Sequence, residues 1–253
     1  MKFLGIIPAR YGSTRLEGKP LIDILGKPMI RHVYEKAAMS LEEVYVATDD
    51  SRILEAVQSF GGKTVMTSSA HQTGTNRCLE AYQKIVKETN DHFDVIINIQ
   101  GDEPLLHPQQ IETLKECFTG EYIMMATLAA PVTDPRDLDN ESEAFVVWDK
   151  HFNALYFSRS VIPYLKGLQK GTWHQHHTFY KHIGLYGYTA EALEIYTGLS
   201  PSSLEISEGL EQNRWIENGY AIKIGLTEYD SMCVDTPEDL EKVRNFMSKS
   251  ERK

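Results

Sequence analysis

Residues 3–20 read FLGIIPARYGSTRLEGKP: a short apolar run ends at Pro8 and leads into a loop that contains Arg10, Arg15 and Lys19. Such a run, bounded by Pro8, is typical of a buried strand. Similar runs follow at residues 43–48, 63–66 and 94–100. Helical patterns separate these runs, and strands that alternate with crossover helices predict an α/β fold. We expect a mostly parallel, twisted sheet with helices on both faces.

The helices of the first half are expected at residues 28–39, 50–60 and 74–88, with a further helix beginning at Pro108. The second half has a less regular pattern. Strands are expected there at 122–132, 144–148, 153–158 and 220–227, an exposed loop at 166–180, and helices at 190–197, 205–218 and from Pro237. We expect one domain, residues 1–253, with a smaller irregular subregion in the second half.

Composition excludes several functional classes. The chain has 253 residues and a net charge of −10, which argues against a nucleic-acid or anionic-membrane surface. Cys78, Cys117 and Cys233 are too far apart for a zinc site or a disulfide framework. No apolar run approaches a membrane span, and the N-terminal apolar run is too short for a signal peptide. We therefore expect a cytoplasmic protein.

The first loop reverses the overall charge, because three bases and Glu17 leave residues 9–19 with a local +2. Ligands of open α/β sheets bind at the carboxyl ends of the strands, where this loop begins. Glycines and cations there suit a nucleoside triphosphate. A solvated loop whose bases pair with surface acids remains equally open. A Walker P-loop is excluded, because five residues separate Gly12 from Gly18 and Pro20 follows Lys19.

Other polar residues allow two interpretations each. Asp102, after strand 94–100, and Asp235 could bind Mg²⁺ together with phosphate oxygens, or could begin turns and helices. Thr73 and Gly74 could contact a base, or could cap the helix that follows. Arg159 could pair with a carboxylate or be an ordinary surface cation. His174, His176 and His177 are interpreted as part of an exposed loop, and Asp49 and Asp50 as a turn and helix cap.

Seven segments carry a resemblance to a known family: IIPARYGSTRLEGKPL (6–21), HQTGTNR (71–77), NIQGDEP (98–104), ALYFSR (154–159), HIGLYGY (182–188), LEQNRWIENG (210–219) and VDTPEDLE (234–241). In this order they resemble the 3-deoxy-manno-octulosonate (Kdo) cytidylyltransferases over nearly the whole chain. The resemblance implies the nucleotide-diphospho-sugar transferase fold. It also implies the Mg²⁺-dependent reaction of CTP with Kdo to CMP-Kdo and pyrophosphate, in lipopolysaccharide biosynthesis, by a homodimer.

The same resemblance implies roles for individual residues. Catalytic roles fall on Arg10, Lys19, Asp102 and Asp235, and the two aspartates would bind Mg²⁺. Nucleotide contacts are implied for Ala9, Arg10, Ser13, Arg15, Lys19, Thr73, Gly74, Gln100 and Asp102. Acid-sugar contacts are implied for Arg15, Gln100, Arg159, His182, Tyr186, Glu211 and Gln212. Residues 1–120 would mainly bind the nucleotide, and residues 121–230 would bind the sugar and form the dimer.

Four positions depart from the pattern of the family. Glu17 replaces a proline, Asn76 an acid, Asn213 an apolar residue and Cys233 a glycine. Asn213 leaves the sugar open, because it adjoins the implied sugar residues. CMP activation of a related acid sugar, such as 8-amino-Kdo or a sialic-acid-like sugar, is the first alternative. A catalytically silent nucleotide-sugar sensor is the second. No residue is an evident general base for attack of the sugar 2-hydroxyl on the α-phosphorus.

Overall fold

A computed structural model describes residues 1–12 and 16–250 of the chain. Its backbone contacts define two compact units. The first unit comprises Met1–Ile111, Tyr188–Thr197 and Ser231–Lys253, and the second comprises Glu112–Gly187 and Gly198–Asp230. That the whole chain forms a single domain stays a prediction.

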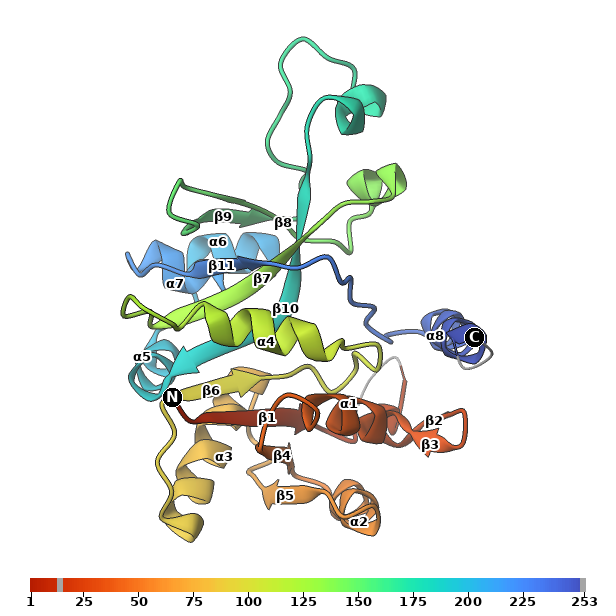
Figure 1. Ribbon diagram of the computed structural model, residues 1–253, viewed down its shortest axis with the longest axis vertical. Helices are drawn as coiled ribbons and strands as arrows, with labels where there is room; N and C mark the ends of the chain where they lie inside the picture. The colour runs from red at the N-terminus through yellow and green to blue at the C-terminus, as the bar shows by residue number, and fades with distance from the viewer. Residues whose placement is uncertain (13–15, 251–253) are drawn as a thin grey trace. The chain divides into compact units, whose positions relative to one another are not determined.

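A parallel sheet forms the centre of the first unit, with the strand order β6–β1–β4–β5 (Figure 1). The strands are β1 (Phe3–Ala9), β4 (Glu43–Thr48), β5 (Lys63–Met66) and β6 (Val95–Asn98). The crossover helices are α1 (Met29–Ala37), α2 (Ser51–Ser59) and α3 (Gly74–Thr89). Leu4, Ile6 and Ile7 of β1 are completely buried, as expected for a strand covered on both faces. This part of the predicted α/β fold is confirmed.

The chain between β1 and α1 contains structure that the sequence patterns did not predict. A short 3₁₀ helix, η1 (Lys19–Leu21), is followed by the hairpin of β2 (Asp23–Ile24) and β3 (Lys27–Pro28). The last helix of the unit, α8 (Pro237–Ser250), begins as expected. Its cap is formed by Thr236, whose Oγ1 accepts a hydrogen bond from the backbone N–H of Asp239 (3.2 Å).

The second unit contains a mixed sheet. Parallel strands β7 (Met125–Pro131) and β11 (Lys223–Leu226) pair, and antiparallel strands β8 (Phe145–Trp148) and β9 (Ala154–Ser158) pair. β10 (Tyr180–Thr189) pairs with β8 in antiparallel orientation. The helices of this unit are η2 (Pro135–Asp139), η3 (Lys170–Gln175), α6 (Ser203–Glu208) and α7 (Asn213–Glu217). The helix α4 (Pro108–Glu116) has residues in both units, and α5 (Ala190–Gly198) belongs to the first unit except for Gly198. The expectation that some strands of the second half are antiparallel is confirmed.

One expectation for the second half is wrong, and another is right only in part. The single helix predicted at 205–218 is two helices, because Gly209 adopts a left-handed conformation (φ 63°) that ends α6. The stretch 166–180 is not simply an exposed loop. It contains η3, and Trp173 is buried, with its ring stacked on Phe179 (centroids 6.0 Å apart). Among the described residues, no helix has both the length and the apolar character that crossing a membrane requires.

Candidate active site

Three charged side chains from distant parts of the first unit meet at one point. Lys19 Nζ donates to Asp102 Oδ2 at 2.6 Å and to Asp235 Oδ1 at 3.0 Å. Lys19 begins η1, Asp102 lies four residues beyond the end of β6, and Asp235 lies two residues before α8. The cation expected to bind phosphate and the two aspartates expected to bind metal are therefore in contact.

Backbone and apolar contacts hold these segments together. The N–H of Val234 donates to the main-chain oxygen of Asp102 (2.9 Å), which joins the two aspartate-bearing segments directly. Val234 is completely buried in an apolar cluster with Ile24 and Met29 from the region after η1 and with Val243 of α8. Burial of these side chains is worth roughly 1.5–3 kcal/mol each. The apolar packing thus places Asp235 beside Lys19.

The charges of this cluster determine its protonation. Burial by itself would lower the pKa of Lys19, but the carboxylates of Asp102 and Asp235 outweigh this effect and raise the pKa. Lys19 is therefore protonated and positively charged at neutral pH. Cys233 adjoins the cluster, and desolvation followed by the negative charges of the two aspartates raises the pKa of its thiol. The thiol therefore stays protonated.

The donor set of this cluster fits a magnesium ion. Ligand atoms of Asp102, Asp235 and Cys233 all lie within 4.8 Å of one another. Mg²⁺ is typically bound by one or two carboxylates together with phosphate oxygens, and it does not prefer a protonated thiol. Two carboxylates and one ammonium also leave a net charge of −1, which attracts a further cation.

Glycines allow close packing where β1 ends and the cationic loop begins. A Cβ on Gly101 would lie 2.9 Å from the main-chain oxygen of Pro8, and one on Gly74 would lie 3.2 Å from Pro8 Cγ. The segment after β6 and the first turn of α3 can therefore both approach the end of β1. Ala9 ends this strand and is buried, and Arg10 follows it with an exposed side chain. Ser13 and Arg15 lie outside the described residues.

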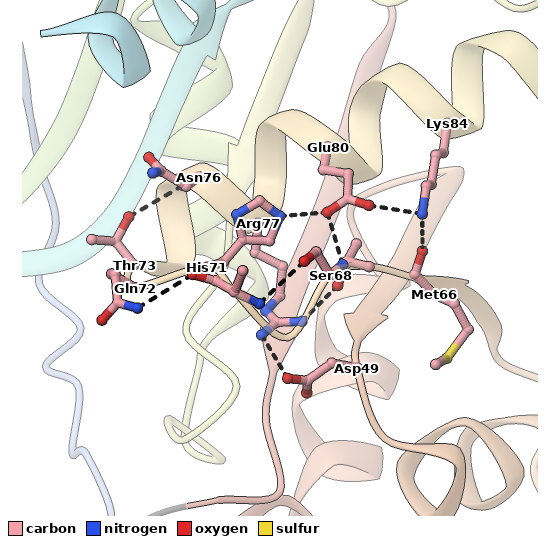
Figure 2. A network of polar contacts seen from close by, with 12 residues as sticks. Asp49, Met66, Ser68, His71, Gln72, Thr73, Asn76, Arg77, Glu80 and Lys84 are labelled. Carbon is pink, nitrogen blue, oxygen red and sulfur yellow. Dashed lines mark hydrogen bonds and ion pairs between the residues drawn. The ribbon is translucent and has the colours of Figure 1, made fainter.

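The segment before α3 is held by a polar network (Figure 2). Thr73 caps α3, because its Oγ1 accepts from the N–H of Asn76 (3.2 Å). The buried Arg77 donates to Thr67 Oγ1 (2.6 Å) and to Asp49 Oδ2 (3.3 Å). The structure therefore shows the capping role of Thr73 and gives Asp49 a definite partner.

Glu80 of α3 anchors the same segment. Its carboxylate accepts from the Ser68 N–H (2.8 Å) and contacts the His71 ring and the Lys84 ammonium (2.7 Å). Desolvation opposes ionisation, but the contacts with Lys84, Ser68 and His71 lower the pKa of Glu80 to about 2. The sequence patterns predict no role for Glu80. His71 and Glu80 are nine residues apart, a spacing that does not by itself indicate contact.

Residues of the second unit that were expected to bind the sugar are also grouped. Tyr186 and His182 both lie on β10, and their rings are 5.2 Å apart. The hydroxyl of Tyr186 donates to Gln212 Oε1 at 3.1 Å. Gln212 is 3% exposed, and its Nε2 is buried with no hydrogen-bond partner among the described residues. Glu211 precedes it and is half-buried.

The hydrogen bonds of Thr127 define the state of the His182 ring. Thr127 Oγ1 lies 2.8 Å from the Leu185 main-chain oxygen, 3.1 Å from that of Ile183 and 2.9 Å from His182 Nε2. The carbonyls can only accept, so the single hydroxyl proton of Thr127 goes to one of them. On this assignment of the hydroxyl proton, the proton of the neutral His182 ring is on Nε2, which donates to Thr127. Burial and then the charge of Arg159 lower the pKa of His182 to about 3, so the ring is neutral and Nδ1 is an acceptor.

Arg159 is held by α6. Its backbone N–H donates to Glu208 Oε2 (2.8 Å), its Nε donates to the Glu208 main-chain oxygen (3.2 Å), and Nη1 donates to the Ser142 main-chain oxygen (2.7 Å). Among the described residues, no partner is seen for Nη2. Glu208 was not identified from the sequence, because it lies 49 positions after Arg159 and nothing in their spacing links them.

Comparisons with known proteins identify the family of this chain. The model of the cytidylyltransferase family matches residues 4–224. A 3-deoxy-manno-octulosonate cytidylyltransferase of Parabacteroides distasonis is 53% identical over 252 residues, which cover 98% of this chain and 99% of that protein. A protein of the same name from Phocaeicola vulgatus is 50% identical and is covered to 99%, as is this chain.

Comparison with solved structures identifies the fold. The structure of a CMP:2-keto-3-deoxy-manno-octonic acid synthetase complexed with CTP matches with a TM-score of 0.89 and 41% identity, and covers 99% of this chain and 100% of that one. A cytidylyltransferase of Leptospira borgpetersenii shares the fold, with a TM-score of 0.61 at 18% identity over 98% of this chain and 87% of that one. The expected nucleotide-sugar transferase fold is confirmed. This chain therefore belongs to the cytidylyltransferase family and, within it, to the 3-deoxy-manno-octulosonate cytidylyltransferases.

Proposed function

We propose that this protein transfers CMP from CTP to the anomeric 2-hydroxyl of Kdo and releases pyrophosphate. The observation that carries the proposal is the meeting of Lys19 with Asp102 and Asp235 at hydrogen-bond distance beyond the carboxyl end of the parallel sheet. A phosphate-binding cation beside two metal-binding carboxylates is what nucleotidyl transfer requires. The names of the relatives identify CTP and the acid sugar as the substrates.

The first unit would bind and polarise CTP. Lys19 is kept protonated by its neighbours, so it can neutralise the charge that grows on the leaving pyrophosphate. Arg10 follows β1 with an exposed guanidinium and would hold the same phosphates. Asp102 and Asp235 would hold Mg²⁺, which when bound stabilises charge on the phosphate oxygens. Thr73, Gly74 and Gln100 would contact the nucleoside.

The second unit would recognise the acid sugar. Gln212 Nε2 is a buried donor without a described partner, and an unpaired group of this kind costs about 1–3 kcal/mol unless a ligand completes it. His182 Nδ1 offers an acceptor to a sugar hydroxyl. Arg159 Nη2 offers N–H groups to the sugar carboxylate, with which a guanidinium pairs well. Together these groups suit a molecule that has both hydroxyls and a carboxylate.

We further propose that the protein acts in lipopolysaccharide biosynthesis in the cytoplasm, as a homodimer. The link to lipopolysaccharide is supported by the Kdo in the names of the relatives. The cytoplasmic location is supported by the location of CTP, and the homodimer by the family resemblance alone.

The test is pyrophosphate release from CTP and Mg²⁺ with Kdo, 8-amino-Kdo and a sialic acid, with UTP in place of CTP as the control. Release with CTP and Kdo, and CMP-Kdo identified by its mass, is the expected result. Pyrophosphate release with another acid sugar and not with Kdo would show that the other sugar is the substrate. CTP binding without release in any mixture would favour a nucleotide-sugar sensor.

A further inference from the structure

One buried side chain forms hydrogen bonds with the backbone N–H and carbonyl groups of a strand in the second unit. Asn213, the first residue of α7, is completely buried. Its Nδ2 donates to the main-chain oxygen of Phe157 (3.0 Å), and its Oδ1 accepts from the N–H of the same residue (3.4 Å). Phe157 lies in β9 opposite Val146 of β8. Asn213 thus pairs with β9 as the peptide group of another strand would.

The contacts of Phe157 lead to the sugar-binding residues proposed above. The Phe157 ring packs edge-on against His182, with centroids 5.0 Å apart and planes at 81°. His182 contacts Tyr186, and the Tyr186 hydroxyl bonds to Gln212. Gln212 is joined to Asn213 by a peptide bond. The contacts therefore form a closed circuit of neighbouring residues that begins and ends at Asn213.

We infer that Asn213 is a positioning residue for acid-sugar recognition, an inference that rests on the proposed function. It orients His182 through the position of Phe157, and it orients Gln212 by fixing the start of α7. The amide of asparagine supplies both a donor and an acceptor to one residue of β9. A leucine would leave the buried N–H and carbonyl of Phe157 unpaired. An aspartate would keep the acceptor but place a second oxygen against the carbonyl.

A merely structural role makes a different prediction, and the chain offers a matched control. α7 is also anchored by Arg214, whose Nε donates to Glu205 Oε2 of α6 at 2.7 Å. Both of these side chains are buried. Glu205→Gln would weaken this anchor without touching the pair between Asn213 and Phe157. If Asn213 only stabilises the helix, its variants should behave like Glu205→Gln.

The kinetic test compares Asn213→Leu, Asn213→Asp and Glu205→Gln with the wild type. We expect both Asn213 variants to raise the KM for the acid sugar about tenfold. A change of this size corresponds to the loss of one or two hydrogen bonds between the protein and the sugar. The KM for CTP should change less than about twofold, because its proposed contacts belong to the first unit. Glu205→Gln should lower the melting temperature and leave the ratio of the two KM values unchanged. Equal changes in both KM values in the Asn213 variants would overturn the inference.

A second readout does not depend on activity. The ¹⁵N resonances of the His182 ring report its tautomer and environment, and His182→Asn identifies them by their disappearance. We expect them to shift in both Asn213 variants and to stay in place in Glu205→Gln. Unchanged resonances in both variants would overturn the inference, even if the wild type proved inactive with Kdo and the proposed function failed. Should Asn213→Leu not fold, Asn213→Asp, which has the same shape, carries the test.

Discussion

Glu208 and Arg159 form two hydrogen bonds, and in each of them the side chain of one residue contacts the backbone of the other. The Glu208 carboxylate accepts the Arg159 backbone N–H at 2.8 Å, and the Arg159 guanidinium donates through Nε to the Glu208 main-chain oxygen at 3.2 Å. The same carboxylate accepts the hydroxyls of Tyr156 (2.8 Å) and Ser158 (2.9 Å). Desolvation opposes ionisation of Glu208, but these contacts lower its pKa. Glu208 is therefore ionised at neutral pH, and its carboxylate holds the end of β9 and Arg159, which follows it.

Glu208→Gln should weaken recognition of the acid sugar. The amide presents one acceptor and one donor, so it cannot accept three hydrogen bonds as the carboxylate does, and Arg159 loses its fixed position. We expect the KM for Kdo to rise about tenfold, since charge-assisted hydrogen bonds are worth about 1.5–3 kcal/mol. Titration of Kdo at fixed CTP measures this effect. Glu217→Gln is the control, because Glu217 also accepts a hydroxyl and a backbone N–H, from Ser203 and Leu204. Equal effects of the two changes would contradict the role of Glu208.

Lys19→Ala should lower the turnover number on the order of 10²-fold, as loss of a transition-state charge contact does. The variant also leaves Asp102 and Asp235 facing each other without the ammonium between them. Single-turnover rates at saturating CTP separate this effect from weakened binding. Lys63→Ala serves as the control, because Lys63 is more exposed and pairs with Glu43 away from the cluster. Near-normal turnover in Lys19→Ala would remove the lysine from the mechanism.

Asp102→Asn and Asp235→Asn should each abolish most of the activity without unfolding the protein, because both carboxylates are proposed to hold the same Mg²⁺. Excess chelator should silence the wild type, and added Mg²⁺ should restore it. Pyrophosphate release and direct Mg²⁺ titration are the measurements. Asp50→Asn is the control: it preserves the cap of α2, since asparagine caps helices as well as aspartate. Full activity in chelator would show that the reaction needs no metal.

Glu80 should make a pH-dependent contribution to stability. Its pKa is lowered from 4.5 to about 2 in the folded protein, so its stabilisation is present above the unfolded pKa and is lost as the pH falls toward 2. We expect Glu80→Gln to lower the free energy of unfolding at pH 7 on the order of 2 kcal/mol. Urea unfolding from pH 7 down to pH 3 should show this difference narrowing. A difference that stays constant with pH would mean that the ionisation of Glu80 does not contribute.

Much of the first unit could be predicted from local patterns. The strands at 43–48 and 63–66 and the helix beginning at Pro108 have the predicted positions, because each short apolar or capped segment is bounded by residues that end it. The second half was predicted less well. Gly209 divided the single helix that was expected at 205–218. Trp173, in the stretch expected to be an exposed loop, is buried in an apolar cluster. At Gly209 a local backbone conformation ended the helix, whereas at Trp173 a tertiary contact overrode the local pattern.

The sequence by itself determined the α/β class, the family through its seven segments, and most of the residues considered for the site, because local periodicity and motif chemistry are written along the chain. Only the tertiary structure decided that Lys19 contacts both Asp102 and Asp235, since this meeting depends on the packing of α8 against the chain near Ile24. It also decided the partners of Arg159 and Asn213, each about fifty residues away in sequence. Contacts over such separations are selected by burial and hydrogen-bond satisfaction of the whole fold, which no local pattern records.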